Sequence, residues 1–227
     1  MGIIRVILVI TPLLSQLSFA QNNWKISLGM STGGAYNFPS KLVIHQEGLP
    51  DISMTAKFAT EAFVLPWYWD INGSVQRNEW IFGMRFNHHK LVLTNPTPDI
   101  QSFEISHGFN MVNGFVGKEF KHFYSSIGMG VSFSHPEGVV RGRWIANHEG
   151  IPLLSGFYDL SGPNFEASVG KKWTFSKHFE AYAECRSTFS SGNIKTYDGS
   201  VDLVTGSIHL NAGLIYFFKL GSKSVDQ

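Results

Sequence analysis

The 227-residue sequence carries 18 lysines and arginines against 17 aspartates and glutamates, which leaves no basic surface large enough to bind nucleic acid. Its single cysteine, Cys185, excludes an intrachain disulfide and a cysteine-rich metal site. Only 15% of the residues are charged, whereas 23 are Gly and 19 are Phe, a composition typical of strands with one apolar face and small residues at crowded positions.

The first twenty residues form a separable segment. Arg5 gives one positive charge, an apolar run follows from Val6 to Leu14, and small residues stand at Ser18 and Ala20. This pattern predicts a secretory signal peptide, residues 1–20, with residues 21–227 forming one domain. A transmembrane anchor is the alternative, but the apolar run is shorter than the ~20 residues that a helix needs to cross a bilayer.

Stretches of alternating apolar and polar residues follow, and each predicts a β-strand with one apolar face. In chain order they span residues 24–31, 67–76, 80–93, 101–116, 120–133, 164–175, 179–189 and 207–218. A further alternating run, Ile52 to Phe58, lies in the long segment 35–66. We interpret this run as part of an external hairpin, which leaves eight strands; if it belongs to the main sheet, the count rises to ten.

The last predicted strand has an unbroken apolar face that includes Leu210, Leu214, Tyr216 and Phe218, opposite a face that begins with His209. The strand ends in Asn211-Ala212-Gly213-Leu214-Ile215-Tyr216-Phe217-Phe218, which reads polar-x-Gly-x-x-aromatic-x-aromatic. This motif resembles the C-terminal targeting strand of bacterial outer-membrane β-barrels. The resemblance implies recognition by the barrel-assembly machinery and export to the outer membrane of a Gram-negative bacterium. The expected fold is all-β, a closed antiparallel up-and-down transmembrane β-barrel, because in lipid only closure pairs every backbone group of a sheet.

The lengths of the connections support this fold. Short ones at 77–79, 117–119 and 176–178 alternate with longer ones at 35–66, 94–100, 134–163 and 190–205. Outer-membrane barrels have short periplasmic turns and longer external loops. Trp24, Trp80 and Trp173 fall near the predicted periplasmic ends and Trp67 and Trp69 near the external ends, which is typical of aromatic girdles and not required of a soluble barrel.

The predicted lumen faces carry many charged residues. They are Lys25, Asp70, Arg85, Glu104, Glu166, Lys172, Glu180, Glu184 and Arg186. An eight-stranded barrel is just wide enough inside to be filled by side chains. We therefore predict a packed network of ion pairs and hydrogen bonds, and not a wide diffusion pore.

A cluster of histidines is predicted near the external rim, where strands 80–93, 101–116 and 120–133 meet. The candidate catalytic residues are His107, Ser106, Glu104, His89, His88 and His135, with Glu137 close by. A histidine could act as general base on Ser106 with Glu104 as its orienting group, or histidines and carboxylates could hold a divalent metal. The alternative is a polar collar at the membrane interface.

Strand parity limits these readings. The alternation puts His88 and His107 on the lipid face, together with Phe103, Ile105, Phe109 and Met111. It puts Glu104, Ser106 and His89 in the lumen, so one triad could include all of them only if a β-bulge intervened. An inward His107 near Ser106 would favour chemistry, and a lipid-facing His107 would favour the collar.

The chain is similar to the lipid A deacylase family in size, topology and strand-borne His and Ser. Ser106-His107-Gly108-Phe109-Asn110 resembles that family's His-x-Ser-Asn, with Phe109 where the nucleophilic Ser would stand. The resemblance therefore implies a role for His107 alone. A Gly-rich phosphate loop and a His-Glu-x-x-His motif are absent from the sequence, so we expect no cofactor and no metal.

The sequence thus predicts a small outer-membrane barrel with a structural, interaction or ligand-binding role at the cell surface. Its expected partners are outer-membrane lipid and lipopolysaccharide, whose phosphates Arg141 and Arg143 could bind. The first alternative is an enzyme, a hydrolase or acyltransferase that modifies an acyl chain of lipid A or another lipid at the external rim. The second is uptake of a small apolar ligand through a lateral opening.

Overall fold

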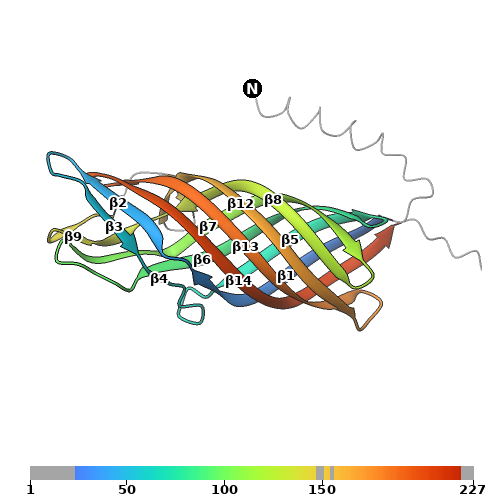
Figure 1. The fold of residues 1–227 in the computed structure, drawn as a ribbon. Helices are drawn as coiled ribbons and strands as arrows, with labels where there is room; N and C mark the ends of the chain where they lie inside the picture. The colour runs from blue at the N-terminus through green and yellow to red at the C-terminus, as the bar shows by residue number, and fades with distance from the viewer. Residues whose placement is uncertain (1–23, 147–150, 154–155, 221–227) are drawn as a thin grey trace, which may run out of the picture.

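The computed structural model describes residues 24–146, 151–153 and 156–220, so the predicted signal peptide lies outside the described residues. The described chain is built from β-strands and their connections (Figure 1). Among the described residues, no helix has the length and apolar character needed to cross a bilayer.

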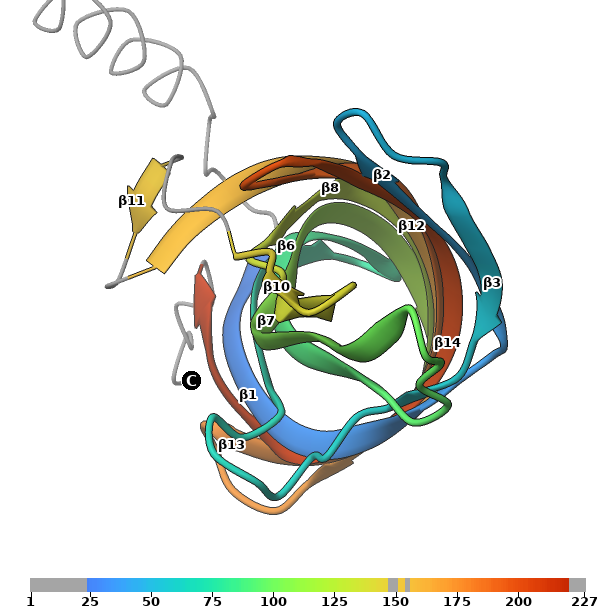
Figure 2. The same cartoon turned by 90° about the vertical axis from the view of Figure 1, so that its left-hand side faces the viewer.

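Eight antiparallel strands pair into a closed ring, which Figure 2 shows end-on. They are β1 (Trp24–Asn37), β5 (Trp69–Arg77), β6 (Trp80–Leu93), β7 (Ile100–Phe120), β8 (Phe123–Ser134), β12 (Gly156–Thr174), β13 (Phe179–Thr196) and β14 (Gly199–Leu220). Each strand pairs with the ring strands that precede and follow it, and β14 returns to pair with β1. The predicted eight-stranded up-and-down barrel is confirmed.

The described remainder forms short strands outside this ring, namely β2 (Ser40–Gln46), β3 (Ile52–Ala56), β4 (Phe58–Ala59), β9 (Glu137–Val140), β10 (Arg143–Trp144) and β11 (Ile151–Leu153). β2 and β3 pair as a hairpin, and β2 also pairs with the first residues of β14, beyond the end of β1. The run from Ile52 to Phe58 is therefore outside the barrel wall, as interpreted.

The two ends of the barrel differ. At one end, which we call the turn end, the tight connections β5–β6, β7–β8 and β12–β13 lie near the start of β1 and the end of β14 (Figure 1). Asn78 and Lys121 have φ of 54° and 59° in two of these turns, a conformation that reverses the chain within two residues. The opposite loop end carries the β2–β3 hairpin and β9.

The seam of the barrel is the pairing of its first strand with its last. β1 and β14 are in register from Trp24 opposite Leu220 to Asn37 opposite Ser207. The apolar face predicted for the last strand does point outward, since Leu210 and Leu214 are 65% and 54% exposed. His209, on the other face, is fully buried inside the barrel.

Several strands are longer than the sequence indicated. β7, β12, β13 and β14 have 21, 19, 18 and 22 residues. The connections predicted at 117–119, 134–163 and 190–205 are therefore wrong in extent: 117–119 belongs to β7, and β13 and β14 pair up to Thr196 opposite Gly199. Serine and glycine made these stretches look like loops, but their backbone groups are satisfied by cross-strand partners.

The wall is apolar outside and polar inside near the turn end. On β13, Glu180, Glu184 and Arg186 are buried, as predicted, whereas Cys185 is exposed on the outer face with Ala183. Exposed apolar side chains cover the outside of the ring, among them Leu28, Met30, Phe82, Met84, Ile127, Met129, Phe165, Val169, Leu210 and Leu214.

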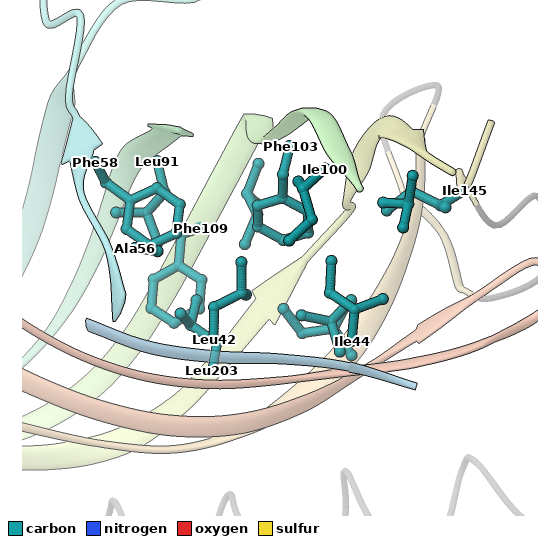
Figure 3. Close-up of a cluster of buried hydrophobic side chains, with 14 of the residues drawn as sticks. Leu42, Ile44, Ala56, Phe58, Leu91, Ile100, Phe103, Phe109, Ile145 and Leu203 are labelled. Atoms are coloured by element: carbon teal, nitrogen blue, oxygen red, sulfur yellow. The ribbon is translucent and has the colours of Figure 1, made fainter. Parts of the chain in front are cut away.

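The interior changes character toward the loop end, where it becomes an apolar core (Figure 3). The core brings together side chains from the ring strands and from the segments beside them, namely Leu42, Ile44, Ala56, Phe58, Leu91, Ile100, Phe103, Ile105, Phe109, Met111, Val140, Ile145, Ile194, Val201 and Leu203. Here the barrel is filled by a hydrophobic core like that of a soluble protein.

This core reverses the orientation predicted for strand 101–116. Phe103, Ile105, Phe109 and Met111 point inward and are at most 2% exposed, and do not face lipid. The prediction assumed that apolar side chains of a barrel strand point outward, which does not hold where the interior itself is apolar.

Candidate functional site

The most buried polar site is a layer of five charged side chains that crosses the lumen. Arg186 Nη1 lies 2.7 Å from Asp70 Oδ2 and 3.6 Å from Glu184 Oε1. Arg85 forms an ion pair with Glu166, and its Nη2 donates to Glu184 Oε2 at 2.9 Å. Two guanidinium groups thus serve three carboxylates, all from strands of the ring. We call this set the charged layer.

Neutral groups complete the charged layer. Tyr124 donates to Glu184 Oε2 at 3.0 Å, and Asn113 Nδ2 donates to Glu166 Oε2 at 2.6 Å. On the loop-end side, Arg186 Nη2 donates to the Tyr68 hydroxyl, which lies 3.0 Å from His209 Nδ1. The predicted packed network is present, and with the apolar core above it the lumen is closed to a wide flow of water and solutes.

The rim cluster lies at the loop end of β7 and consists of Glu104, Ser106, His107, His135 and Glu137. Ser106 Oγ donates to Glu137 Oε2 at 3.2 Å. His107 Nδ1 and His135 Nε2 lie 3.4 Å and 3.6 Å from Glu137 Oε1. Glu137 is therefore the centre of the cluster, a part that the sequence placed nearby but did not select as a candidate.

A β-bulge creates this arrangement. Between the pairs His89–Phe109 and Leu91–Ile105, residues 106–108 of β7 stand opposite the single residue Lys90. Gly108 has φ of 112°, and a Cβ atom there would lie 2.5 Å from the His88 ring. The bulge turns His107 outward, where its side chain is 54% exposed. This orientation favours the polar collar over a triad inside the lumen.

The two neighbouring histidines of β6 separate. His88 lies on the outer side, stacked on Trp69 at 5.5 Å between ring centroids, and its Nδ1 is 2.8 Å from Asn110 Oδ1. His89 points into the lumen, where its ring lies 5.0 Å from that of His209. Of the six candidates, four therefore meet in the rim cluster, His88 lies beside it and His89 lies in the lumen.

Two placements differ from the prediction. Glu104 and Ser106 lie on the face of β7 opposite Phe103 and Ile105, and thus outside the lumen. Glu104 pairs with Glu137 across the strands. Burial raises the pKa of the Glu104 carboxyl above its ordinary value, and the nearby Glu137 charge raises it further.

The rim cluster contains the side chains of an acid–base site, but the Ser106 hydroxyl donates its hydrogen bond to the Glu137 carboxylate and not to an imidazole. Tyr158, which the sequence did not indicate, donates to the His107 carbonyl oxygen at 2.7 Å and fixes the backbone of the bulge. Within the described ranges, no three or more His, Cys, Asp or Glu side chains are grouped so as to hold a metal ion.

The lumen also contains two residues that sequence reasoning passed over, Tyr68 and His209. His209 Nε2 lies 2.9 Å from Thr188 Oγ1, so both ring nitrogens have partners. The signal was available for His209, because it stands on the polar face of an alternating strand. Tyr68 also gave a signal, because it shares a face with Asp70 on the predicted strand 67–76, although the structure places it just before β5.

The closed ring, the apolar exterior and the filled polar interior define a small eight-stranded β-barrel of the outer-membrane type. Neither family models nor curated proteins match the sequence.

Solved structures of similar architecture include neisserial surface protein A, with 10% identity, coverage of 86% of this chain and 97% of that one, and a TM-score of 0.42. Outer membrane protein AlkL has 13% identity, covers 91% and 95%, and has a TM-score of 0.44. OprG from Pseudomonas aeruginosa has 9% identity, covers 88% and 97%, and has a TM-score of 0.43. At this level of likeness, the fold assignment rests on the strand pairing described above.

Proposed function

We propose that this protein is an outer-membrane barrel with a closed lumen, which presents its loop end at the cell surface for a structural, interaction or ligand-binding role. The observation that carries the proposal is the pairing of an apolar outer wall with a lumen blocked by the charged layer. An exposed apolar wall is unfavourable in water and favourable in lipid. A filled lumen makes a role as a diffusion pore unfavourable and leaves the loop end as the functional surface.

The loop end is suited to such a role because its projecting segments are paired with the ring and packed against one another. The β2–β3 hairpin pairs with β14, and Val140 and Ile145 from the region of β9 and β10 are fully buried in the apolar core. Arg141 Nη2 donates to the Pro50 carbonyl oxygen at 2.9 Å, so the two projecting segments also contact each other. We propose lipid and lipopolysaccharide as the partners of this surface.

The orientation is tested by thiol labelling of intact cells. In a Cys185→Ala background, a Glu47→Cys variant in the β2–β3 turn is expected to react with a membrane-impermeant maleimide, since the Glu47 side chain is exposed. The matched variant Lys177→Cys, in a turn at the other end, is expected to react only after the outer membrane is permeabilised. The reverse pattern would overturn the orientation, and equal labelling of both in intact cells would overturn the membrane location.

A second candidate function is modification of a lipid acyl chain at the rim cluster. The specific observation in its favour is that Ser106, His107 and His135 all contact Glu137 on the outer side of the barrel. There a hydroxyl, two imidazoles and a carboxylate could reach a lipid from the side. No wider lateral opening is needed for this, because the cluster lies outside the lumen.

Mass spectrometry of lipid A tests this candidate. If the rim cluster is catalytic, cells with the protein gain or lose an acyl chain relative to cells without it. The change is expected to disappear in a His107→Ala variant and to persist in the control His122→Ala, which alters a histidine in the β7–β8 turn at the other end. An unchanged lipid A profile, or a change that survives His107→Ala, would exclude this role for His107.

A further inference from the structure

The connection between β4 and β5 carries an unusual concentration of exposed apolar side chains. Phe63, Val64, Leu65 and Trp67 are 80%, 55%, 75% and 60% exposed, and no charged residue interrupts the stretch from Ala62 to Trp67. We call residues 62–67 the apolar loop. In the end-on view, the teal chain between β4 and β5 passes outside the blue wall of β1 (Figure 2), and a short loop projects there from the side of the barrel (Figure 1).

The apolar loop continues the outer wall at its loop-end margin. Thr60 Oγ1 donates to the Ala35 carbonyl oxygen at 2.9 Å, and Thr32 Oγ1 donates to the Tyr68 carbonyl oxygen at 3.0 Å, which fixes both ends of the segment to β1. Farther along β1, Tyr36 is 63% exposed and packs edge-on against Phe38.

The same strand carries Leu28 and Met30, which are 59% and 60% exposed on the wall. The apolar surface thus runs without a charged side chain from the middle of β1 to the loop, since the residues of β1 from Leu28 to Asn37 are all uncharged.

Part of the backbone of the apolar loop is paired within the protein. Val64 N–H donates to the Glu61 carbonyl oxygen at 3.0 Å, and Tyr68 N–H donates to the Ala62 carbonyl oxygen at 2.9 Å. The Val64 carbonyl oxygen accepts from Lys90 Nζ at 2.9 Å. A loop in water has no need of an ammonium group buried beneath it, whereas in hydrocarbon each unpaired backbone group costs several kcal/mol.

Lys90 is itself suited to this position. It is only 2% exposed although it stands on the outer side of β6, and the Glu61 carboxylate lies 3.8 Å from its ammonium group. The apolar loop therefore covers the Lys90 ammonium group, which in turn binds the backbone of the loop. Its positive charge is balanced by Glu61, which directly precedes the loop.

We propose that the apolar loop inserts its Phe63, Leu65 and Trp67 side chains among the acyl chains of the outer leaflet, so that lipid is the occupant of this surface. The inference rests on the membrane location proposed above. The continuity with the apolar wall favours lipid over a soluble protein partner, whose binding would not require it, and the pairing of both Val64 backbone groups lowers the cost of moving this part of the loop out of water. Insertion would hold the segment that carries Tyr68 against the barrel and would bring lipid beside the rim cluster.

The experiment uses the fluorescence of Trp67 in the full-length protein reconstituted into phosphatidylcholine vesicles. The emission of Trp67 is obtained by subtracting the emission spectrum of the Trp67→Phe variant from that of the wild type. The emission of Trp173, which lies on the wall at the turn end, is obtained in the same way with Trp173→Phe. With lipids brominated on their acyl chains, we expect Trp67 emission to fall to the same degree as Trp173 emission. Aqueous iodide is expected to quench neither.

The outcomes separate this inference from the proposal on which it rests. Quenching of Trp173 but not of Trp67 by brominated lipid, with Trp67 open to iodide, would overturn insertion of the loop and leave the barrel in the membrane. Quenching of neither by brominated lipid would overturn both. Protection of Trp67 from lipid and iodide alike would show that protein, such as a second copy, covers the loop. A Phe63→Ser, Leu65→Ser variant is expected to make Trp67 accessible to iodide while Trp173 stays protected.

Discussion

Replacing Arg186 with methionine is expected to lower the free energy of unfolding by about 3–5 kcal/mol, the usual cost of removing one partner from a buried ion pair. The Arg186 side chain has no exposed surface, and its loss would leave Arg85 as the one guanidinium group for the three carboxylates of the charged layer, so that the buried negative charge is no longer balanced. The measurement is urea-induced unfolding of the protein in detergent micelles, followed by tryptophan fluorescence.

Two further variants serve as comparisons for Arg186→Met. Lys118→Met removes an exposed ion pair with Glu79 and is expected to cost no more than about 1 kcal/mol. Adding Asp70→Asn to Arg186→Met is expected to recover part of the loss, because it removes one of the stranded charges. Equal losses in Arg186→Met and Lys118→Met would mean that water reaches the charged layer and that the lumen is not closed.

Shortening Leu91 to alanine is expected to cost about 2–5 kcal/mol, because the side chain is fully buried in the apolar core and its removal leaves a cavity. The loss is expected to be concentrated at the loop end. Hydrogen exchange should therefore rise at Leu42 and Ile44, whose side chains pack in the same core, and stay low in the turn-end half of β13.

The control for this variant is Leu49→Ala, which makes the same chemical change in the β2–β3 turn, where the leucine is 39% exposed. A change within about 0.5 kcal/mol is expected there. If Leu91→Ala is equally mild, or if it raises exchange evenly along the barrel, the loop end does not have a hydrophobic core of its own.

Much of the fold could be predicted from the period-2 alternation, because a barrel wall between lipid and a filled lumen imposes it on every strand. The strands that carry Arg85, Glu184 and Arg186 were oriented correctly, because a charged face is favourable in the lumen and unfavourable on the apolar outer wall. The lengths of β13 and β14 were not predicted. Ser190, Gly192 and Asn193 have the composition of a loop, and only their pairing with β14 makes them strand.

The orientation of β7 is the largest error, and it has a physical cause. Alternation gives the two faces of a strand but not the side on which each lies, and on β7 both the lipid and the apolar core are apolar surroundings. Phe103 and Ile105 satisfy either. Phe103 and Ile105 point inward because they pack with residues such as Leu42 and Val140, which are distant in sequence. The pattern of a single strand therefore cannot predict this orientation.

The candidate site was predicted in part for the same reason. Proximity of Ser106, His107 and His135 follows from the strand order, which the sequence indicated. The bulge at residues 106–108 depends on Gly108 and on the single residue opposite. The sequence therefore indicated that a triad would need a bulge, but it did not show at which residues the bulge lies. Glu137 became the centre of the cluster because β9 continues along β7 beyond the bulge.

The seam between β1 and β14 bears on how this molecule is made. Trp24 of β1 pairs with Leu220 of β14, so one edge of β1 has no neighbour in the ring until β14 pairs with it. A prematurely terminated chain would keep two open edges, which attract other chains in water and are intolerable in lipid. The ring can therefore close only when β1 and β14 are both present and paired with each other.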